Sequence, residues 1–458
     1  MGSADRVRPQ DAAFFYLEGP ATPYHIASLM IVEGPPLDHE ELLDAIGERV
    51  AFAPRLLQRL RSVPLARPRW VDDASFDLRY HVRRTSLPGP GTERQLLEVA
   101  ARLHAQHLSR SRPLWECWCI EGLAGGRFAL LMKIHHSLVD GVSGTELMNL
   151  FLDPAPEART YEPEPWVPRR APGILRLAVS SAADAVLAPL RSARRAIAEA
   201  RSPTRLLRDV RDVVAGLTSI ARAALDPAPA SSFNVPIGPN RIIAVARAPL
   251  ADLRDIKSAL GGTVNDVVLA AASGGLRAVM RSRGIEPRTV TLRALVPVSL
   301  HRKDDGTQGN RVTAILAPLP VSEDDPGRRL AIIRRATRIA KASGQGAGAE
   351  LLLQAGAALP PPIAMLVAGA QSVQRFFNVS VTNIAGPPTP LWIRGRRVEE
   401  IIPLRPLSAN AGVIVAAMSY AGQMCFGIVA DGDALPDAGL VAEGIEKSIV
   451  ELRHEAGG

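Results

Sequence analysis

One strand constrains the fold of this 458-residue chain more than any other segment. The residues from Arg127 to Ile134, RFALLMKI, are almost all apolar, which predicts a strand that is buried on both faces. Such a strand needs neighbouring strands on both sides and packed layers above and below, as in an α/β domain. The preceding segment, LWECWCIEG, is expected to pair with it as a hairpin that turns at Gly125 and Gly126.

The composition predicts a globular protein rather than a disordered or membrane-spanning one. Hydrophobic residues make up 47% of the chain and charged residues 22%, and the length is sufficient for two domains. The first residues lack the apolar run of a secretory signal, and Arg6 argues against N-myristoylation. The most apolar segment, from Leu351 to Ala370, is interrupted by three prolines, so we expect buried or interfacial segments there.

The cysteines indicate a reducing compartment. Only Cys117, Cys119 and Cys425 are present, and their spacing matches neither a disulfide framework nor a zinc site. Cys117 and Cys119 alternate along the first strand of the predicted hairpin, which is typical of core positions. We therefore expect a cytoplasmic protein with free thiols.

Positive charge is concentrated in the middle of the chain. Between Arg169 and Arg222 there are eleven arginines and four acidic residues, which leaves +7 of the total net charge of +8. The apolar spacing in this stretch predicts amphipathic helices. Two hypotheses remain open: the helices lie on an anionic membrane surface, or they form a solvated linker. Nucleic-acid binding is not expected, because aromatic residues make up only 4% and no recognised motif is present.

Proline-rich segments on both sides of the basic stretch predict three parts: an N-terminal domain (1–153), a helical connector (154–230) and a C-terminal domain (231–458). Both outer parts are expected to mix strands and helices in an α/β (α+β) fold. A strand is predicted from Tyr24 to Gly34 and a helix after Asp38. In the C-terminal part, a helix is predicted to begin between Thr263 and Asp266.

Chemistry is predicted at HHSLVDG, His135 to Gly141, where the apolar strand ends before the next helix. Zinc needs three or four protein ligands, and no further cluster of such residues stands out, so no metal is expected. One imidazole can face the reaction space as an acid–base group while its neighbour packs the other way. Gly141 leaves room for a substrate and Asp140 can anchor the loop. The pattern therefore favours catalysis over a polar turn.

HHSLVDG resembles the HHxxxDG motif of the CoA-dependent acyltransferase superfamily. The surrounding sequence is similar to the bacterial wax ester synthase/diacylglycerol acyltransferase (WS/DGAT) family almost from end to end. The similarity is carried by QDAAFFYLEGPATPYHIASL (10–29), SRPLWECWCIEGLAGGRFALLMKIHHSLVDGVSG (111–144), GGTVNDVVLA (261–270), ALVPVSL with GNRV (294–312) and SVTNIAGP (380–387).

The resemblance implies two chloramphenicol-acetyltransferase-like domains in one chain, joined by a helical connector, with an active-site tunnel between them. It implies an acyl-CoA-dependent O-acyltransferase in which His136 is the general base, His135 and Asp140 give support, and no acyl-enzyme forms. The co-substrate is acyl-CoA, no cofactor is needed, and the acceptor is diacylglycerol or a long-chain alcohol, giving triacylglycerol or wax ester. A cytoplasmic protein that touches the inner membrane or lipid droplets would suit these substrates.

Four further residues are candidates for substrate binding or structure. Asn265 and Asp266 match the family's ND motif, but Asn and Asp at a helix start are also ordinary N-terminal caps. Thr382 and Asn383 would lie at a strand end facing the tunnel, although TNIAGP departs here from the family's usual SNVPGP.

Two alternatives remain beside the acyltransferase hypothesis. The same scaffold can acylate another lipid or a carrier-bound acceptor, although no carrier domain is evident in the sequence. The chain can also be a catalytically silent lipid-binding relative. An intact HHSLVDG argues against the silent relative.

Overall fold

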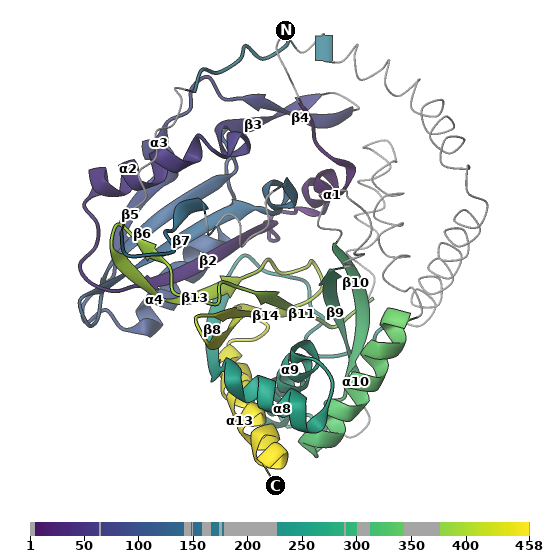
Figure 1. Ribbon diagram of the computed structural model, residues 1–458. Helices are drawn as coiled ribbons and strands as arrows, with labels where there is room; N and C mark the ends of the chain where they lie inside the picture. The colour runs from purple at the N-terminus through teal and green to yellow at the C-terminus, as the bar shows by residue number, and fades with distance from the viewer. Residues whose placement is uncertain are drawn as a thin grey trace, which may run out of the picture.

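A computed structural model gives the architecture of most of the chain (Figure 1). Much of the basic connector lies outside the described residues, as do Leu351 to Ala370, so the predictions made for them stay predictions. The described residues are 5–63, 66–141, 148, 150–157, 166–173, 176–177, 227–287, 290–299, 312–342 and 376–457.

The first six-stranded sheet is built around the apolar strand. Its order is β12-β13-β2-β7-β6-β5, in which only the β5–β6 pair is parallel. Eight of the nine residues of β7 are buried, because β2 and β6 flank it and helices and a second sheet cover its faces. The predicted central position of this strand and its hairpin with β6 are therefore confirmed. The strands are β2 (His25–Val32), β5 (Val82–Ser86), β6 (Trp115–Leu123), β7 (Arg127–His135), β12 (Trp392–Ile393) and β13 (Arg396–Leu404).

Helices and a small sheet complete the first half. Asp38 caps α2 as predicted, since its side chain accepts a hydrogen bond from the Glu40 backbone N–H at 3.3 Å. Thr92 and Gln95 form a capping box at the start of α4. The elements are β1 (Asp5–Arg6), α1 (Pro9–Leu17), α2 (His39–Val50), the 3₁₀ turn η1 (Pro54–Leu57), β3 (Gln58–Val63), β4 (Ala66–Asp72), α3 (Leu78–His81), α4 (Glu93–Ala105) and the 3₁₀ turn η2 (His136–Gly141).

The second six-stranded sheet has the order β10-β9-β11-β14-β15-β8, with helices packed on one face. Helices α9 and α13 approach closely at Gly275, where an added Cβ would lie 2.5 Å from the Val441 carbonyl oxygen. The elements are β8 (Arg241–Pro249), α8 (Leu250–Leu260), α9 (Val264–Ser282), β9 (Leu292–Ser299), β10 (Val312–Leu319), α10 (Pro326–Ala342), β11 (Val379–Ala385), β14 (Val413–Tyr420), β15 (Gln423–Asp431) and α13 (Ala438–Gly457).

Strand β13 joins the two halves. It comes from the C-terminal part of the chain but pairs with β2 in the first sheet, where Leu404 lies opposite Ala27 (Figure 1). It also packs so tightly on β15 that a Cβ at Gly427 would lie 1.9 Å from the Pro403 carbonyl oxygen. The sheets therefore do not follow the sequence division at residue 231, because residues 392–404 belong structurally to the first sheet.

The described residues contain neither a candidate membrane-spanning helix nor a candidate metal-binding cluster. None of the described helices is long and apolar enough to cross a membrane. Likewise, no group of three or more His, Cys, Asp or Glu side chains within the described part is arranged to hold a metal ion.

Candidate active site

The two histidines lie where β7 ends and the chain turns into η2. The His135 backbone N–H donates to the Leu114 carbonyl oxygen at 2.9 Å, and the His136 N–H donates to the Tyr24 carbonyl oxygen at 2.9 Å. His135 is still a strand residue, opposite His25 of β2, whereas His136 already begins the turn. The change of backbone conformation between them gives the two rings different surroundings.

His135 is fixed on three sides. The backbone N–H and the hydroxyl of Ser137 lie 3.2 and 2.7 Å from its Nδ1, which therefore accepts, and the ring proton is on Nε2. Nε2 faces the Glu18 carboxylate at 4.0 Å, and the Phe15 ring is stacked on the imidazole at 4.4 Å. Burial first, and then electrostatic repulsion of a protonated ring by His136 and Arg110, lower the pKa of His135 to about 3. This imidazole is neutral and held in place.

His136 is less constrained. Its ring packs on Phe14 with centroids 4.1 Å apart, and it keeps part of its surface accessible. Its Nδ1 has no hydrogen-bond partner within the described part of the chain. Removal from water, followed by the charge of Arg405, lowers the pKa of His136 to about 3. The ring is therefore neutral at pH 7 and has an uncommitted nitrogen.

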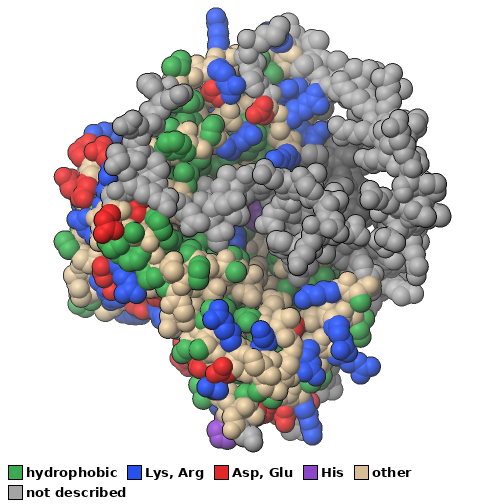
Figure 2. All heavy atoms as spheres, in the orientation of Figure 1, with side chains coloured by type: hydrophobic (Ala, Val, Ile, Leu, Met, Phe, Trp, Pro, Cys, Tyr) green, Lys and Arg blue, Asp and Glu red, His purple; other side chains and the backbone are tan. Residues whose placement is uncertain are grey.

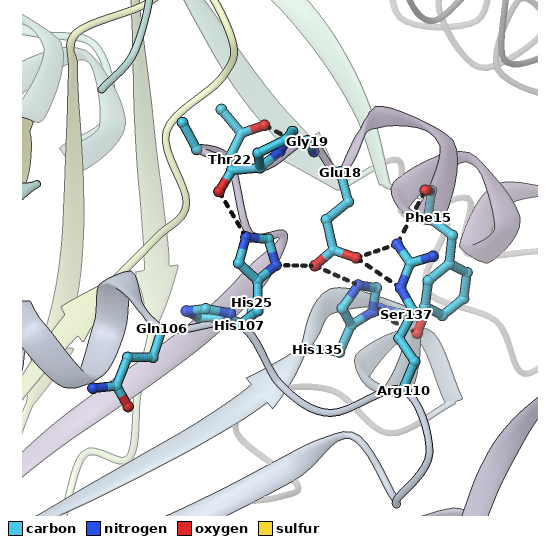
Figure 3. Close-up of polar contacts among 12 residues, drawn as sticks. Phe15, Glu18, Gly19, Thr22, His25, Gln106, His107, Arg110, His135 and Ser137 are labelled. Atoms are coloured by element: carbon cyan, nitrogen blue, oxygen red, sulfur yellow. Dashed lines mark hydrogen bonds and ion pairs between the residues drawn. The ribbon is translucent and has the colours of Figure 1, made fainter. Parts of the chain in front are cut away.

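Glu18 organises the polar groups around His135, as Figure 3 shows. Its side chain is only 7% exposed, yet it accepts from Arg110 Nε at 3.2 Å and from a terminal nitrogen of the same guanidinium. His107 Nδ1 lies 3.4 Å from the carboxylate on another side. Sequence analysis missed Glu18, although it lies inside the segment that carries the family resemblance. Its only sequence feature is an acidic residue at the end of an apolar helix.

Arg405 reaches the histidines through the crossing strand β13. It follows Leu404, the last residue of that strand, and its carbonyl oxygen lies 3.3 Å from His104 Nε2. Burial lowers the pKa of Arg405 to about 10, which leaves it charged at neutral pH. Among the described residues no carboxylate pairs with its guanidinium. Sequence analysis missed this residue as well, because it is 269 positions from His136 (405 minus 136).

Asp266 has a structural role at the start of α9. It forms a capping box with Thr263, whose backbone N–H donates to its carboxylate at 2.8 Å. Its other oxygen accepts from the Thr337 hydroxyl of α10 at 2.7 Å. Asp266 therefore takes part in the cap of α9 as the third residue of the helix, whereas the N-cap residue itself is Thr263 and not Asn265 or Asp266. Asn265 is half-buried in the first turn of the same helix.

The remaining candidates are not brought to the histidines by the contacts of the described residues. Thr382 and Asn383 lie on β11, opposite Ala416 and Ala417 of β14. The Thr382 hydroxyl is buried without a hydrogen-bond partner in the described structure. The backbone of Asp140 and Gly141 completes η2. The side-chain role of Asp140 falls outside the described residues.

The cysteines are core residues, as predicted. Cys117 and Cys119 lie on one face of β6, Cys425 lies on β15, and all three are free and buried. Burial raises the pKa of Cys119 to about 12 and that of Cys117 further. A buried neutral thiol is a poor nucleophile, so these residues contribute packing rather than chemistry.

The predicted tunnel is not outlined by the described pockets. A pocket of about 230 Å³ lies between the halves, lined by residues that include Arg127, Arg247 and Glu400. Its two arginines pair with Glu399 and Glu400, at 3.2 and 2.6 Å. Neither histidine lines it, so the tunnel stays a prediction.

Two α/β halves with a neutral histidine pair in an HHxxxDG motif define an acyltransferase of the CoA-dependent type. The sequence matches the wax ester synthase/diacylglycerol acyltransferase catalytic domain over residues 7–268 and the WS/DGAT C-terminal domain over residues 308–453. This chain belongs to the wax ester synthase/diacylglycerol acyltransferase family.

Named relatives cover nearly the whole chain. A probable diacylglycerol O-acyltransferase of Mycobacterium tuberculosis (strain ATCC 25618 / H37Rv) is 38% identical over 439 residues, which is 93% of this chain and 90% of that protein. A second probable diacylglycerol O-acyltransferase of that strain is 32% identical over 466 residues, covering 99% of this chain and 100% of the relative.

Solved structures confirm the predicted fold class. The wax ester synthase/diacylglycerol acyltransferase from Marinobacter aquaeolei VT8 superposes with a TM-score of 0.71 at 28% identity, covering 99% of this chain and 100% of that one. The starter condensation domain of rhizomide synthetase has a TM-score of 0.55 at 14% identity, covering 100% and 95% of the two chains. At that identity the second match shows a shared fold only.

Proposed function

We propose that this chain transfers a fatty acyl group from acyl-CoA to the hydroxyl of diacylglycerol or of a long-chain alcohol. Triacylglycerol or wax ester is the product, and His136 is the general base. The observation that carries the proposal is the contrast between the two Nδ1 atoms: His135 Nδ1 accepts hydrogen bonds from Ser137, whereas His136 Nδ1 has no hydrogen-bond partner among the described residues. The His135 Nε2 faces the Glu18 carboxylate at 4.0 Å, and only the His136 side chain keeps part of its surface accessible. The names of the relatives support the choice of substrates.

His136 would act in two proton transfers. As the acceptor oxygen attacks the thioester carbonyl carbon, its proton passes to the neutral imidazole. The tetrahedral intermediate then collapses, the bond to sulfur breaks, and the imidazolium returns the proton to the departing CoA thiolate. Every proton is accounted for without an acyl-enzyme and without a cofactor.

Because the pKa of His136 is low, the site must stabilise the imidazolium that forms during the reaction. A base with a pKa of about 3 is available at pH 7, but protonating it is costly. Negative charge on the thioester carbonyl oxygen offsets that cost as the intermediate forms, because the imidazolium is then next to an anion. We infer that the Arg405 cation has two effects. In the resting site it disfavours protonation of His136, and during the reaction it attracts the developing oxyanion.

The other predicted residues take supporting roles in this proposal. Glu18 and Ser137 would hold His135 so that its ring forms a fixed wall beside His136, and Asp140 would anchor η2. Asn265, Thr382 and Asn383 remain candidates for contacts with substrate. A cytoplasmic protein that meets its lipid acceptor at a membrane or droplet surface fits these assignments.

The test is acceptor-dependent thiol release from palmitoyl-CoA, with 1,2-diacylglycerol or hexadecanol, for the wild type and His136→Ala. Loss of a general base should lower the rate by about a hundredfold or more. A matched control is His454→Ala, since His454 is exposed near the end of α13 and should be replaceable without effect. No release with either acceptor would refute the substrate class, and full activity in His136→Ala would refute the residue assignment.

Two competing functions predict different outcomes of that assay. An enzyme for another lipid or a carrier-bound acceptor would release thiol only when that acceptor is supplied. A silent lipid-binding protein would retain palmitoyl-CoA without releasing thiol. The His136 Nδ1, which has no hydrogen-bond partner among the described residues, argues for chemistry and against the silent protein.

A further inference from the structure

Helix α10 has an unusual charge for an outer helix. Its 17 residues, PGRRLAIIRRATRIAKA, include six basic side chains and no acidic one. It lies at the edge of the second half, and Figure 2 shows Lys and Arg side chains gathered over the region where Figure 1 places it. The similarly long helix α13 has four glutamates, one lysine and one arginine, so basic charge is not general to the helices of this half.

The inner face of α10 is fixed to the domain. Leu330, Ile333 and Ala340 are buried in the core of the second half. The Arg329 guanidinium donates to the Ser448 hydroxyl of α13 at 3.0 Å, and the Thr337 hydroxyl donates to Asp266 of α9 at 2.7 Å. The helix is therefore a rigid part of the protein, and its outer face has a defined orientation.

The outer face combines branched apolar side chains with cations. Ile332 and Ile339 are 42% and 55% exposed, although isoleucine is among the residues most often buried. They are seven positions apart, which places them on one side of a helix, and Arg335 lies between them on that side. Of the five large hydrophobic side chains that are exposed in the described structure, two belong to this one helix.

The outer cations are available for an external partner. Arg335, Arg338 and Lys341 are exposed, and none of them forms an ion pair with another described residue. The nearest acidic group in sequence, the Asp324–Asp325 pair, precedes the helix, and Asp324 is already paired with arginines of α9. Within the part of the chain that the structure describes, the outer face of α10 is thus positive without a local acidic partner.

We propose that the outer face of α10 is a docking surface for anionic phospholipid. Ile332 and Ile339 enter the boundary between headgroups and acyl chains, while Arg335 and Arg338 lay their aliphatic stems beside them and bind phosphates. The exposed side of a single helix is convex and has no groove for a peptide, but it can lie flat on a lipid surface. The charge is complementary to anionic headgroups.

This inference deepens the proposed function, because a lipid acceptor is met at such a surface, but its test does not require catalysis. Flotation of the purified full-length protein would be compared with vesicles of pure phosphatidylcholine and with vesicles containing phosphatidylglycerol, at low and high salt. We expect binding to the anionic vesicles only, and weaker binding at high salt.

Two double variants assign the binding to α10. Arg335→Gln/Arg338→Gln should weaken the partition coefficient by roughly thirtyfold, from the usual contribution of each basic residue near an anionic surface. Ile332→Ser/Ile339→Ser should weaken binding even at low salt. The matched control is Val450→Ser, an exposed apolar residue on α13, which should bind like the wild type. Circular dichroism spectra would verify that each variant is folded.

Other outcomes would overturn the proposal. If the wild-type protein does not bind anionic vesicles, or binds neutral vesicles equally well, α10 is not a docking surface for anionic phospholipid. If the double variants bind like the wild type, the docking site does not lie on α10. A dimer that the Ile332→Ser/Ile339→Ser variant dissociates, without any vesicle binding, identifies the face as a contact between two copies. If vesicle binding is as expected but no thiol is released, the proposed function fails while the docking surface stands.

Discussion

Replacing Glu18 by glutamine tests whether this carboxylate holds the histidine site together. The variant keeps the size of the side chain but removes its charge, which now lies between Arg110, His107 and His135 (Figure 3). Because Nδ1 of His135 is occupied by Ser137, Glu18 is the group that faces the Nε2 proton. Without the carboxylate charge, the His135 ring loses the electrostatic attraction between its Nε2–H group and Glu18, which favours the present ring orientation.

The expected cost follows from the exposure of the partners. A hydrogen bond to a charged group contributes about 1.5–3 kcal/mol when it is buried. Arg110 is 54% exposed and can return to water, so we discount this to about 1–2 kcal/mol in the free energy of unfolding. Activity should fall roughly tenfold, as is typical when a group that orients an imidazole is lost.

Urea unfolding and thiol release from palmitoyl-CoA measure these two effects. The matched control is Glu40→Gln, because Glu40 pairs with Arg79 through contacts of 2.7 and 2.8 Å on the surface, with the Glu40 side chain 63% exposed. That change should cost less than about 0.5 kcal/mol and leave activity intact. If Glu18→Gln behaves like the control in both assays, Glu18 does not position His135 and the reasoning is refuted.

Three further substitutions test other parts of the structure. Arg405→Met removes a cation that lowers the pKa of His136, so the acid limb of the pH–rate profile should move to higher pH and the rate at pH 7 should fall. An unchanged profile would show that Arg405 does not influence the protonation of His136. Asp266→Ala removes a cap and a link to α10 and should cost about 1–2 kcal/mol in urea unfolding, whereas wild-type stability would contradict the capping role. Gly427→Ala places a Cβ 1.9 Å from the Pro403 oxygen, so thermal unfolding should occur at a markedly lower temperature unless β13 and β15 can separate freely.

The local features of the fold were predictable because they depend on neighbours in the chain. A nearly continuous apolar run predicts the buried strand β7, and the two glycines after Leu123 predict its hairpin with β6. Thr263 followed by Asp266 predicts the cap of α9. The histidine motif and its place at a strand end follow from the same local pattern.

Tertiary structure alone decided what surrounds the histidines. Pairing between β13 and β2 joins segments hundreds of residues apart, and strand periodicity does not specify a partner, so the sequence did not indicate that residues 392–404 join the first sheet. That pairing is what brings Arg405 toward His136. Glu18, Arg110 and His135 likewise meet only because α1 packs beside the end of β7, and the charge that each histidine feels depends on this packing. Sequence identifies the residue types suited to acid–base chemistry, whereas burial and distant charges determine the surroundings and the pKa of each of the two imidazoles.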